Sequence, residues 1–257
     1  IHSRAVYHKK GKLRGMVYEY LERYTFKKAD LLVAVNDATR DHFAKKYPYY
    51  RDKIITIPIG VDMTQFQPGE KTHLRNRWEL DNDDKVMLFV GRLEKEKNLT
   101  FLMDVFKQVK QRIPNSKLVI AGTGRDEEDL KAYARENDIT DVIFTGNVPN
   151  GRVPGLMNCA DVFTLCSLYE GSPTVIKEAL ACNVPVVSVD AGDVKEVIGD
   201  LDGCFVAEHT VKDFSAKVIT VINQNLTYDF RHHIDVYKNE NMFARLLDVY
   251  NRLDRSR

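Results

Sequence analysis

No apolar run in the sequence reaches the ~18 residues that a membrane-spanning helix needs. The first residues also lack the basic end and apolar core of a secretory signal. The four cysteines have no C-x-x-C spacing of the kind that binds zinc, which favours reduced, mostly buried thiols in a cytoplasmic protein. The formal net charge of only +1 gives no indication of a nucleic-acid partner. With 44% hydrophobic and 29% charged residues among 257, the composition is that of a globular protein of one to two domains.

Two nucleotide-binding fingerprints are also missing. No G-x-G-x-x-G is followed by an acidic residue about 20 positions later, which argues against a dinucleotide-dependent dehydrogenase. No G-K-[ST] phosphate loop is present either. A nucleotide bound by this chain therefore needs a different set of phosphate ligands.

The sequence does contain a regular alternation of short apolar runs with segments of helical periodicity. Six runs are rich in β-branched and aromatic residues, as is typical of strands buried on both faces. These runs lie at 86–90, 117–121, 142–145, 161–166, 185–189 and 203–206. The helical segments between them include 99–109, 126–137 and 173–182. Repeated β-α-β units predict an α/β fold, a doubly wound and mostly parallel Rossmann-like sheet, with ligands at the carboxyl ends of its strands.

The first 60 residues differ from this pattern. Two helical and two strand segments (13–28, 31–35, 37–47 and 54–59) are too few to bury a core of their own. We interpret residues 1–60 as the tail end of a preceding Rossmann-like domain. Residues 61–84 are then a linker, 85–230 the main sheet domain, and 231–257 a C-terminal helix.

The segment from Glu170 to Glu178 carries the clearest site pattern. Ser172 is a favoured N-cap and Pro173 a favoured first helical residue, so the amides of Thr174 and Val175 would be free to bind phosphate. Glu178 would lie along the helix, within reach of a ribose, and Glu170 would stay in the loop near a sugar. The alternative is a plain helix start with two surface glutamates.

A second candidate site follows the run at 86–90. Gly91 permits a tight turn, Arg92 comes directly after the strand, and Lys97 precedes a helix that Asn98 would cap. Two cations beside a helix N-terminus can neutralise a diphosphate. The alternative is a solvated charge cluster, because E-K-E-K runs are often exposed.

Two further loops follow the next strands. Ala121-Gly122-Thr123-Gly124 fits a close approach of the backbone to a ligand, although glycines end many strands. Gly146, Asn147, Val148 and Pro149 follow the third run and could offer backbone groups to a base. An ordinary turn is the alternative at both places.

Five separated motifs together resemble glycosyltransferase family four, which has the GT-B fold. They are G-R-x₄-K from Gly91, A-G-x-G from Ala121, the pair Ala160-Asp161, E-x₇-E from Glu170, and I-P-x-G-V-D-x₃-F-x-P from Ile57. The resemblance covers about 21–206. It implies a retaining hexosyltransferase that needs no metal or other cofactor and takes its sugar from a nucleotide diphosphate donor, with UDP favoured.

The same resemblance implies roles for the candidate residues. Arg92 and Lys97 would contact the diphosphate, Glu170 the donor sugar, and Glu178 the ribose. The catalytic set is then Glu170, Arg92 and Lys97. The donor-binding set is Gly91, Arg92, Lys97, Gly124, Asn147, Val148, Glu170, Gly171, Ser172, Pro173, Thr174 and Glu178. The family usually has an aromatic residue where this chain has Ser172, which leaves the donor sugar open.

The acceptor would be a glycan or a lipid-linked glycan of surface polysaccharide or glycolipid synthesis. The basic stretch from His2 to Lys28 is compatible with peripheral contact at the inner face of a membrane, or with a solvated helix face. We expect the chain to be mainly the donor-binding half, and inactive in transfer when alone. A non-catalytic nucleotide-sugar-binding module acting with another chain is the alternative function, and a sugar-nucleotide epimerase a weaker one.

Overall fold

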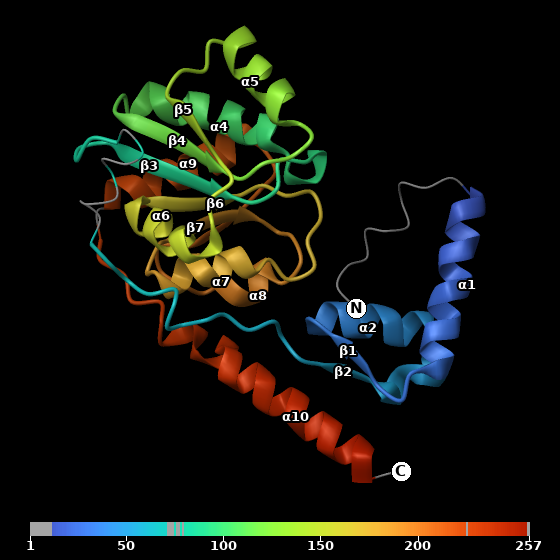
Figure 1. Cartoon of the computed structure of the whole chain (residues 1–257). Coiled ribbons are helices and arrows are strands. Elements are labelled where there is room, and N and C mark those ends of the chain that lie inside the picture. The colour runs from blue at the N-terminus through green and yellow to red at the C-terminus, as the bar shows by residue number, and fades with distance from the viewer. Residues whose placement is uncertain (1–11, 71–74, 76–77, 79, 225, 256–257) are drawn as a thin grey trace.

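The computed structural model describes residues 12–70, 75, 78, 80–224 and 226–255. Within them lie two units of different size, joined by an extended linker (Figure 1). The basic residues at the start of the chain, from His2 to Lys10, lie outside the described residues. No helix in the described part is long and apolar enough to span a membrane.

The larger unit is built on one six-stranded sheet in which every neighbouring pair is parallel, in the order β5-β4-β3-β6-β7-β8. The strands are β3 (Lys85–Val90), β4 (Ser116–Ala121), β5 (Val142–Gly146), β6 (Val162–Leu165), β7 (Val186–Val189) and β8 (Phe205–Ala207). All six predicted strands are present, and the prediction of a doubly wound sheet is confirmed. The central strand β3 is fully buried from Val86 to Phe89, which explains its unbroken apolar sequence.

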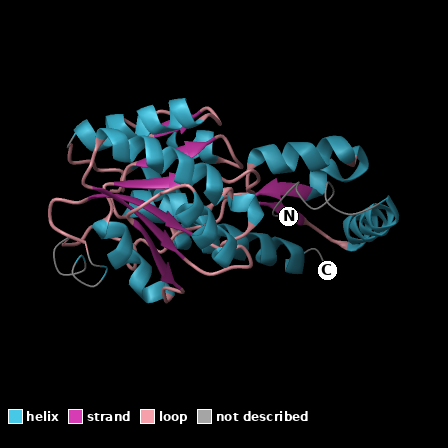
Figure 2. Ribbon diagram, turned by 90° about the horizontal axis from the view of Figure 1, so that it is seen from above, coloured by secondary structure: helices cyan, strands magenta, loops and turns pink. Residues whose placement is uncertain are grey.

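Helices cover both faces of this sheet (Figures 1 and 2). On one face lie α4 (Leu99–Arg112), α5 (Glu127–Glu136) and α9 (Val211–Gln224). On the other face lie α6 (Val153–Cys159), α7 (Thr174–Ala181) and α8 (Val194–Ile198). The chain builds outward from β3 in one direction and from β6 in the other, so right-handed crossovers place α4 and α5 on one face and α7 and α8 on the opposite face. All four cysteines are free and buried.

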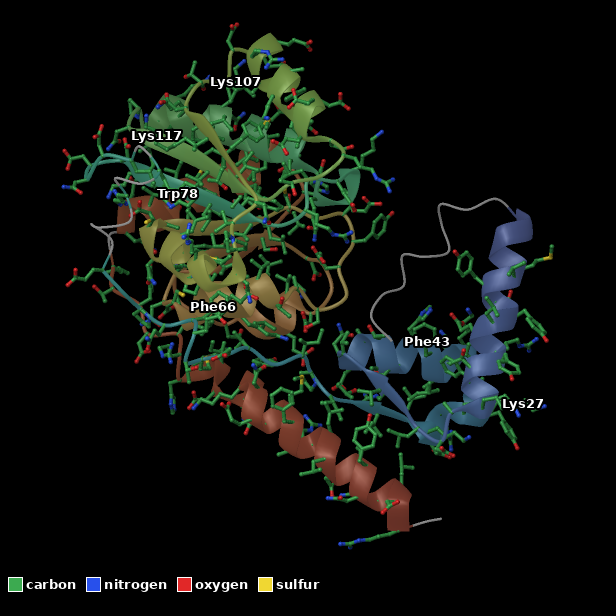
Figure 3. All side chains as sticks on the ribbon, in the orientation of Figure 1. Lys27, Phe43, Phe66, Trp78, Lys107 and Lys117 are labelled. Carbon is green, nitrogen blue, oxygen red and sulfur yellow. The ribbon has the colours of Figure 1, made fainter. Side chains whose placement is uncertain are left out.

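The smaller unit contains α1 (Lys12–Lys28), β1 (Leu32–Ala34), α2 (Asp37–Lys46) and β2 (Ile54–Thr56). Its two strands are parallel, and a small cluster that includes Phe26 and Phe43 holds it together, with ring centroids 5.6 Å apart. Phe43 is labelled on α2 in Figure 3. The strand predicted at 54–59 is shorter than expected because the chain turns into the linker before Pro58.

The C-terminal helix α10 (Asn239–Arg255) begins later than the helix predicted over 231–257, because a short 3-10 helix (His233–Tyr237) precedes it, and it connects the two units. At its start, Val61 of the linker bridges to Lys238. Further along, Arg245 donates a hydrogen bond of 2.9 Å to the carbonyl of Thr56 in β2. Helix α10 therefore leaves the large unit and runs beside the small one (Figure 1).

A buried arginine in the linker explains the Ala160-Asp161 pair. Arg75 is 4% exposed and donates to three carbonyls before β3 and to the carbonyl of Cys159. It also lies 3.3 Å from the carboxylate of Asp161, which accepts the amide of Val86 at 2.8 Å. The acid thus holds the amino ends of β3 and β6, at the edge of the sheet opposite the candidate site.

Candidate functional site

The two central strands bring the main site residues together. Because β3 and β6 are neighbours whose chains then diverge to opposite faces, the loops that follow them meet at the carboxyl edge of the sheet. Lys97 comes from the first loop and Glu170 from the second. Their Nζ and Oε1 atoms are 2.5 Å apart, and both side chains are largely shielded, at 21% and 13% exposed. The structure therefore joins two predicted residues that are 73 positions apart.

The loop carrying Lys97 is held rigidly on both sides. The amide of Leu168 donates to the carbonyl of Glu96 at 2.8 Å, and the Cys166 thiol donates to the carbonyls of Lys97 and Asn98. The prediction that the Asn98 side chain caps α4 is wrong. Asn98 is left-handed, with φ 53°, and its side-chain amide contacts His209 instead of the helix amides.

Arg92 lies in the same loop but is far more exposed. Its guanidinium is 3.3 Å from the Glu94 carboxylate, and its side chain is 77% exposed. An exposed pair of this kind is only weakly ordered, so Arg92 is free to turn toward a ligand.

Helix α7 begins within the segment from Glu170 to Glu178, as predicted, but its cap differs. The helix starts at Thr174, with Pro173 in the N-cap position, so the placement of Ser172 as N-cap and Pro173 as first helical residue is wrong. The Ser172 hydroxyl instead donates to the Asp193 carboxylate at 2.6 Å and accepts from the Lys177 ammonium at 2.9 Å. The first amides of α7 still have no intrahelical partner, because every helix leaves its first amides unpaired.

Glu178 lies one turn into α7 and is partly buried. Burial raises the pKa of its carboxyl to about 7, and a hydrogen bond with Thr174 offsets a part of that shift. Such a group changes its charge near neutral pH. Its carboxylate form gains from any ligand hydroxyl that donates to it.

The glycine loops pack against one another at the same edge. Gly91 donates to the carbonyl of Ala121, and Gly122 donates to that of Gly146, each at 2.9 Å. A Cβ on Gly124 would lie 2.1 Å from the carbonyl oxygen of Leu93, so the close approach predicted there is made by the chain itself. Beyond β5, Asn147 is exposed and Val148 packs on the core.

Three buried polar residues near this edge were not predicted. Asn36 lies two residues after β1, caps α2 by accepting from the amide of Thr39, and donates to the carbonyl of Gly171 at 2.6 Å. Lys177 and Asp193 lie beneath Ser172. Asn36 could have been found, since a polar residue directly after an apolar strand is the same signal that identified Arg92. Lys177 shows no such signal, because a lysine on an amphipathic helix normally faces solvent.

A cleft lies between the small unit and this edge of the sheet. Its lining includes Thr39 and Asn36 from the small unit, and Tyr169, Glu170 and Gly192 from the large one. Tyr169 is 50% exposed there. One side of the predicted site therefore faces α2 of the small unit.

Comparison with known proteins identifies the family. The model of the glycosyl transferases group 1 matches residues 70–240, and that of glycosyltransferase family 4 matches residues 1–65. A relative from Bacillus subtilis, TuaC, whose name assigns it to teichuronic acid biosynthesis, is 32% identical over 71% of this chain and 46% of its own length. An Escherichia coli enzyme named UDP-Gal:alpha-D-GlcNAc-diphosphoundecaprenol alpha-1,3-galactosyltransferase is 28% identical over 88% of this chain and 60% of its own. The chain spans between 44% and 62% of the length of the first five curated relatives it matches.

Solved structures share the architecture. HepE of Anabaena, determined with UDP and glucose, superposes with a TM-score of 0.81 at 18% identity, over 91% of this chain and 66% of its own. Sucrose-phosphate synthase from Thermosynechococcus elongatus superposes with a TM-score of 0.79 at 17% identity, over 99% of this chain and 65% of its own. At such identities these likenesses concern the fold alone. The chain belongs to the group 1 glycosyltransferases, in family four, and has the GT-B fold.

Proposed function

We propose that this chain binds the donor of a retaining, metal-independent glycosyltransferase, a nucleotide diphosphate-sugar with UDP favoured over GDP. The observation that carries the proposal is the contact of 2.5 Å between Lys97 and Glu170 at the switch point of the sheet. A cation and an acid held there, beside the start of α7, provide separate positions for a diphosphate and for sugar hydroxyls.

In this proposal positive charge gathers where the leaving diphosphate develops negative charge. Lys97, Arg92 and the first amides of α7 supply that charge, and such preorganised groups stabilise a transition state strongly. They supply it without a metal ion, which is the basis for proposing metal independence. Glu170 accepts hydrogen bonds from donor-sugar hydroxyls, and Glu178 accepts them from the ribose.

The relatives' names support a nucleotide-sugar donor and a surface-glycan product. The Escherichia coli relative is named for UDP-Gal, and a Mycolicibacterium smegmatis relative, 31% identical over 68% of this chain, is named for GDP-mannose. Because both bases occur among them, the nucleotide must be measured. Transfer itself belongs to the whole protein, and in this chain we expect binding with little or no transfer.

Calorimetric titration with UDP and GDP tests the donor site. We expect one nucleotide to bind, and Lys97→Ala to weaken it by about tenfold to a hundredfold, because a charge-assisted hydrogen bond contributes roughly 1.5–3 kcal/mol. Arg92→Ala should lose about tenfold or less, because its exposed guanidinium must be ordered on binding. The matched control is Lys107→Ala, which removes an exposed lysine of α4 (Figure 3) and should leave the affinity unchanged.

Equal losses in the Lys97 and Lys107 variants would contradict the assignment, because only one of these lysines lies at the strand ends. Failure of the unmodified chain to bind either nucleotide would contradict the proposed function. Anomeric retention is tested separately, by NMR of the product that the whole protein forms.

We also propose a glycan or lipid-linked acceptor, approached by peripheral contact of α1 with the inner face of a membrane. Tyr20 and Tyr24 of α1 are 69% and 54% exposed, and Lys27 and Lys28 follow in its last turn. The double variant Tyr20→Glu/Tyr24→Glu should reduce co-sedimentation with phosphatidylglycerol vesicles by about fivefold. Tyr49→Glu, at a tyrosine that is 90% exposed on a different segment, is the control. Equal binding by both variants, or none by the unmodified chain, would contradict this assignment.

A further inference from the structure

A fully buried lysine lies directly beneath the proposed diphosphate site. Lys177 is in the first turns of α7, next to Glu178 in sequence, yet it is 0% exposed. Removing an ammonium group from water costs several kcal/mol unless other groups replace its solvation. The groups that replace this lost solvation therefore indicate the role of Lys177.

Those partners come from four separate segments of the chain. The ammonium donates to the hydroxyl of Ser172 at 2.9 Å and to the carbonyl of Ile59 in the linker at 3.1 Å. It lies 3.6 Å from the carboxylate of Asp193, before α8, and 4.5 Å from the ring centroid of Tyr237, before α10. We name Lys177, Asp193 and Ser172 the buried triad.

The buried triad fixes the loop on which the proposed phosphate site depends. The Ser172 hydroxyl donates to Asp193 at 2.6 Å while it accepts from Lys177, so its side chain has a single orientation, away from the site. On the other side of the loop, Asn36 donates to the carbonyl of Gly171 at 2.6 Å. The peptide units that lead into α7 are thus held from two sides, and the direction of the first amides of the helix is set with them.

Stability alone does not account for this arrangement. A buried lysine–carboxylate pair is usually no more stabilising than well-packed apolar side chains of the same volume. One oxygen of Asp193, Oδ1, is buried without a hydrogen-bond partner among the described residues, which is a further cost. A role in orienting the start of α7 does account for the burial of the pair and for the unpaired Oδ1, because a helix N-terminus binds an anion through amides that point at the ligand.

We propose that Lys177 and Asp193 are positioning residues that aim the start of α7 at the diphosphate of the donor and tie this loop to the linker at Ile59. The inference rests on the proposed function. Neither side chain contacts the donor. They act through Ser172, and their effect falls on the phosphates and not on the base or ribose.

The test compares a nucleoside diphosphate with its nucleoside, because only the former meets the start of α7. UDP and uridine, or GDP and guanosine if GDP is the nucleotide that binds, are titrated into the whole chain and followed by NMR. We expect Lys177→Met to weaken diphosphate affinity about tenfold and nucleoside affinity less than about twofold. Asp193→Asn, which keeps the shape of the side chain, should lose diphosphate affinity in the same selective way.

The matched control is Lys217→Met on α9. Lys217 also bonds one carbonyl, that of Val206 at 3.1 Å, and one carboxylate, that of Asp213 at 2.7 Å, but it lies away from the site. Wild-type affinities in a folded Asp193→Asn variant, or equal losses for diphosphate and nucleoside, would overturn the inference. If Lys177→Met does not fold, Asp193→Asn decides the question. Failure of the unmodified chain to bind UDP or GDP would overturn the proposed function itself, and the inference with it.

Discussion

Alanine in place of Gly122 is expected to destabilise the fold by about 4 kcal/mol or more, which is an exceptional loss for one methyl group. Gly122 follows β4 with φ at +134°, a conformation that side chains rarely adopt, and a Cβ there would lie 1.9 Å from the carbonyl oxygen of Gly91. The backbone that carries this oxygen cannot move away easily. The two loops continue the neighbouring strands β3 and β4, and the amide of Gly91 is bonded to Ala121.

A series of four glycine-to-alanine variants separates the causes by urea denaturation. Gly151 has open space around it and no unusual φ, so its variant should change the free energy of unfolding by less than about 0.5 kcal/mol. Gly146 also has open space around it but a φ of +67°. Its alanine variant should therefore lose about 1 kcal/mol of unfolding free energy, from the backbone conformation alone. Gly124 isolates the steric cost, because its Cβ would meet Leu93 without an unusual φ. If the Gly122 variant is as stable as the Gly146 variant, or more stable, this explanation is contradicted.

The fold was predictable because its signals are local. Each strand of the large sheet is an unbroken apolar run, and α4, α5 and α7 show helical periodicity of their own, so no long-range information was needed for these elements. The short crossover helices α6 and α8 were not predicted. The glycines illustrate the limit of this reasoning. A-G-x-G was correctly placed at a strand end, but the backbone it approaches is that of Gly91 and Leu93, in the loop after the neighbouring strand.

The site was only partly predictable because its contacts are not local. The approach of Lys97 to Glu170 could be anticipated because each follows a strand, and the parallel sheet brings such residues to one edge. The orientation of Ser172 depends on Lys177 and Asp193, and the burial of Lys177 depends on Ile59, 118 positions away. No pattern within one segment encodes such a contact, so a favoured N-cap residue was assigned to a cap that the structure does not form.

Glu178→Gln is expected to stabilise the unliganded chain at pH 8 and to weaken nucleotide-sugar binding at the same pH. Burial raises the pKa of Glu178 to about 7 from 4.5, so the folded state favours the protonated form. The penalty for ionising the group is absent below pH 4.5, grows between pH 4.5 and 7, and is complete above pH 7. Glutamine removes a penalty of up to about 3 kcal/mol at pH 8, at 1.36 kcal/mol per pKa unit, and almost none at pH 4.

The same substitution that stabilises the fold is expected to weaken donor binding. UDP-glucose is the suitable probe, because its diphosphate diester does not titrate near neutral pH. For the unmodified chain, affinity should rise between pH 5.5 and about 7.5, since the ribose hydroxyls donate to the carboxylate and the proton must leave first. The Glu178→Gln variant should bind about tenfold more weakly at pH 8, with an affinity that does not depend on pH. The neighbouring Cys182 does not interfere, because burial raises the pKa of its thiol to about 12. A variant that is stabilised at pH 8 and still binds as tightly as the unmodified chain would place the ribose elsewhere, and the raised pKa of Glu178 would then reflect burial without a role in donor binding.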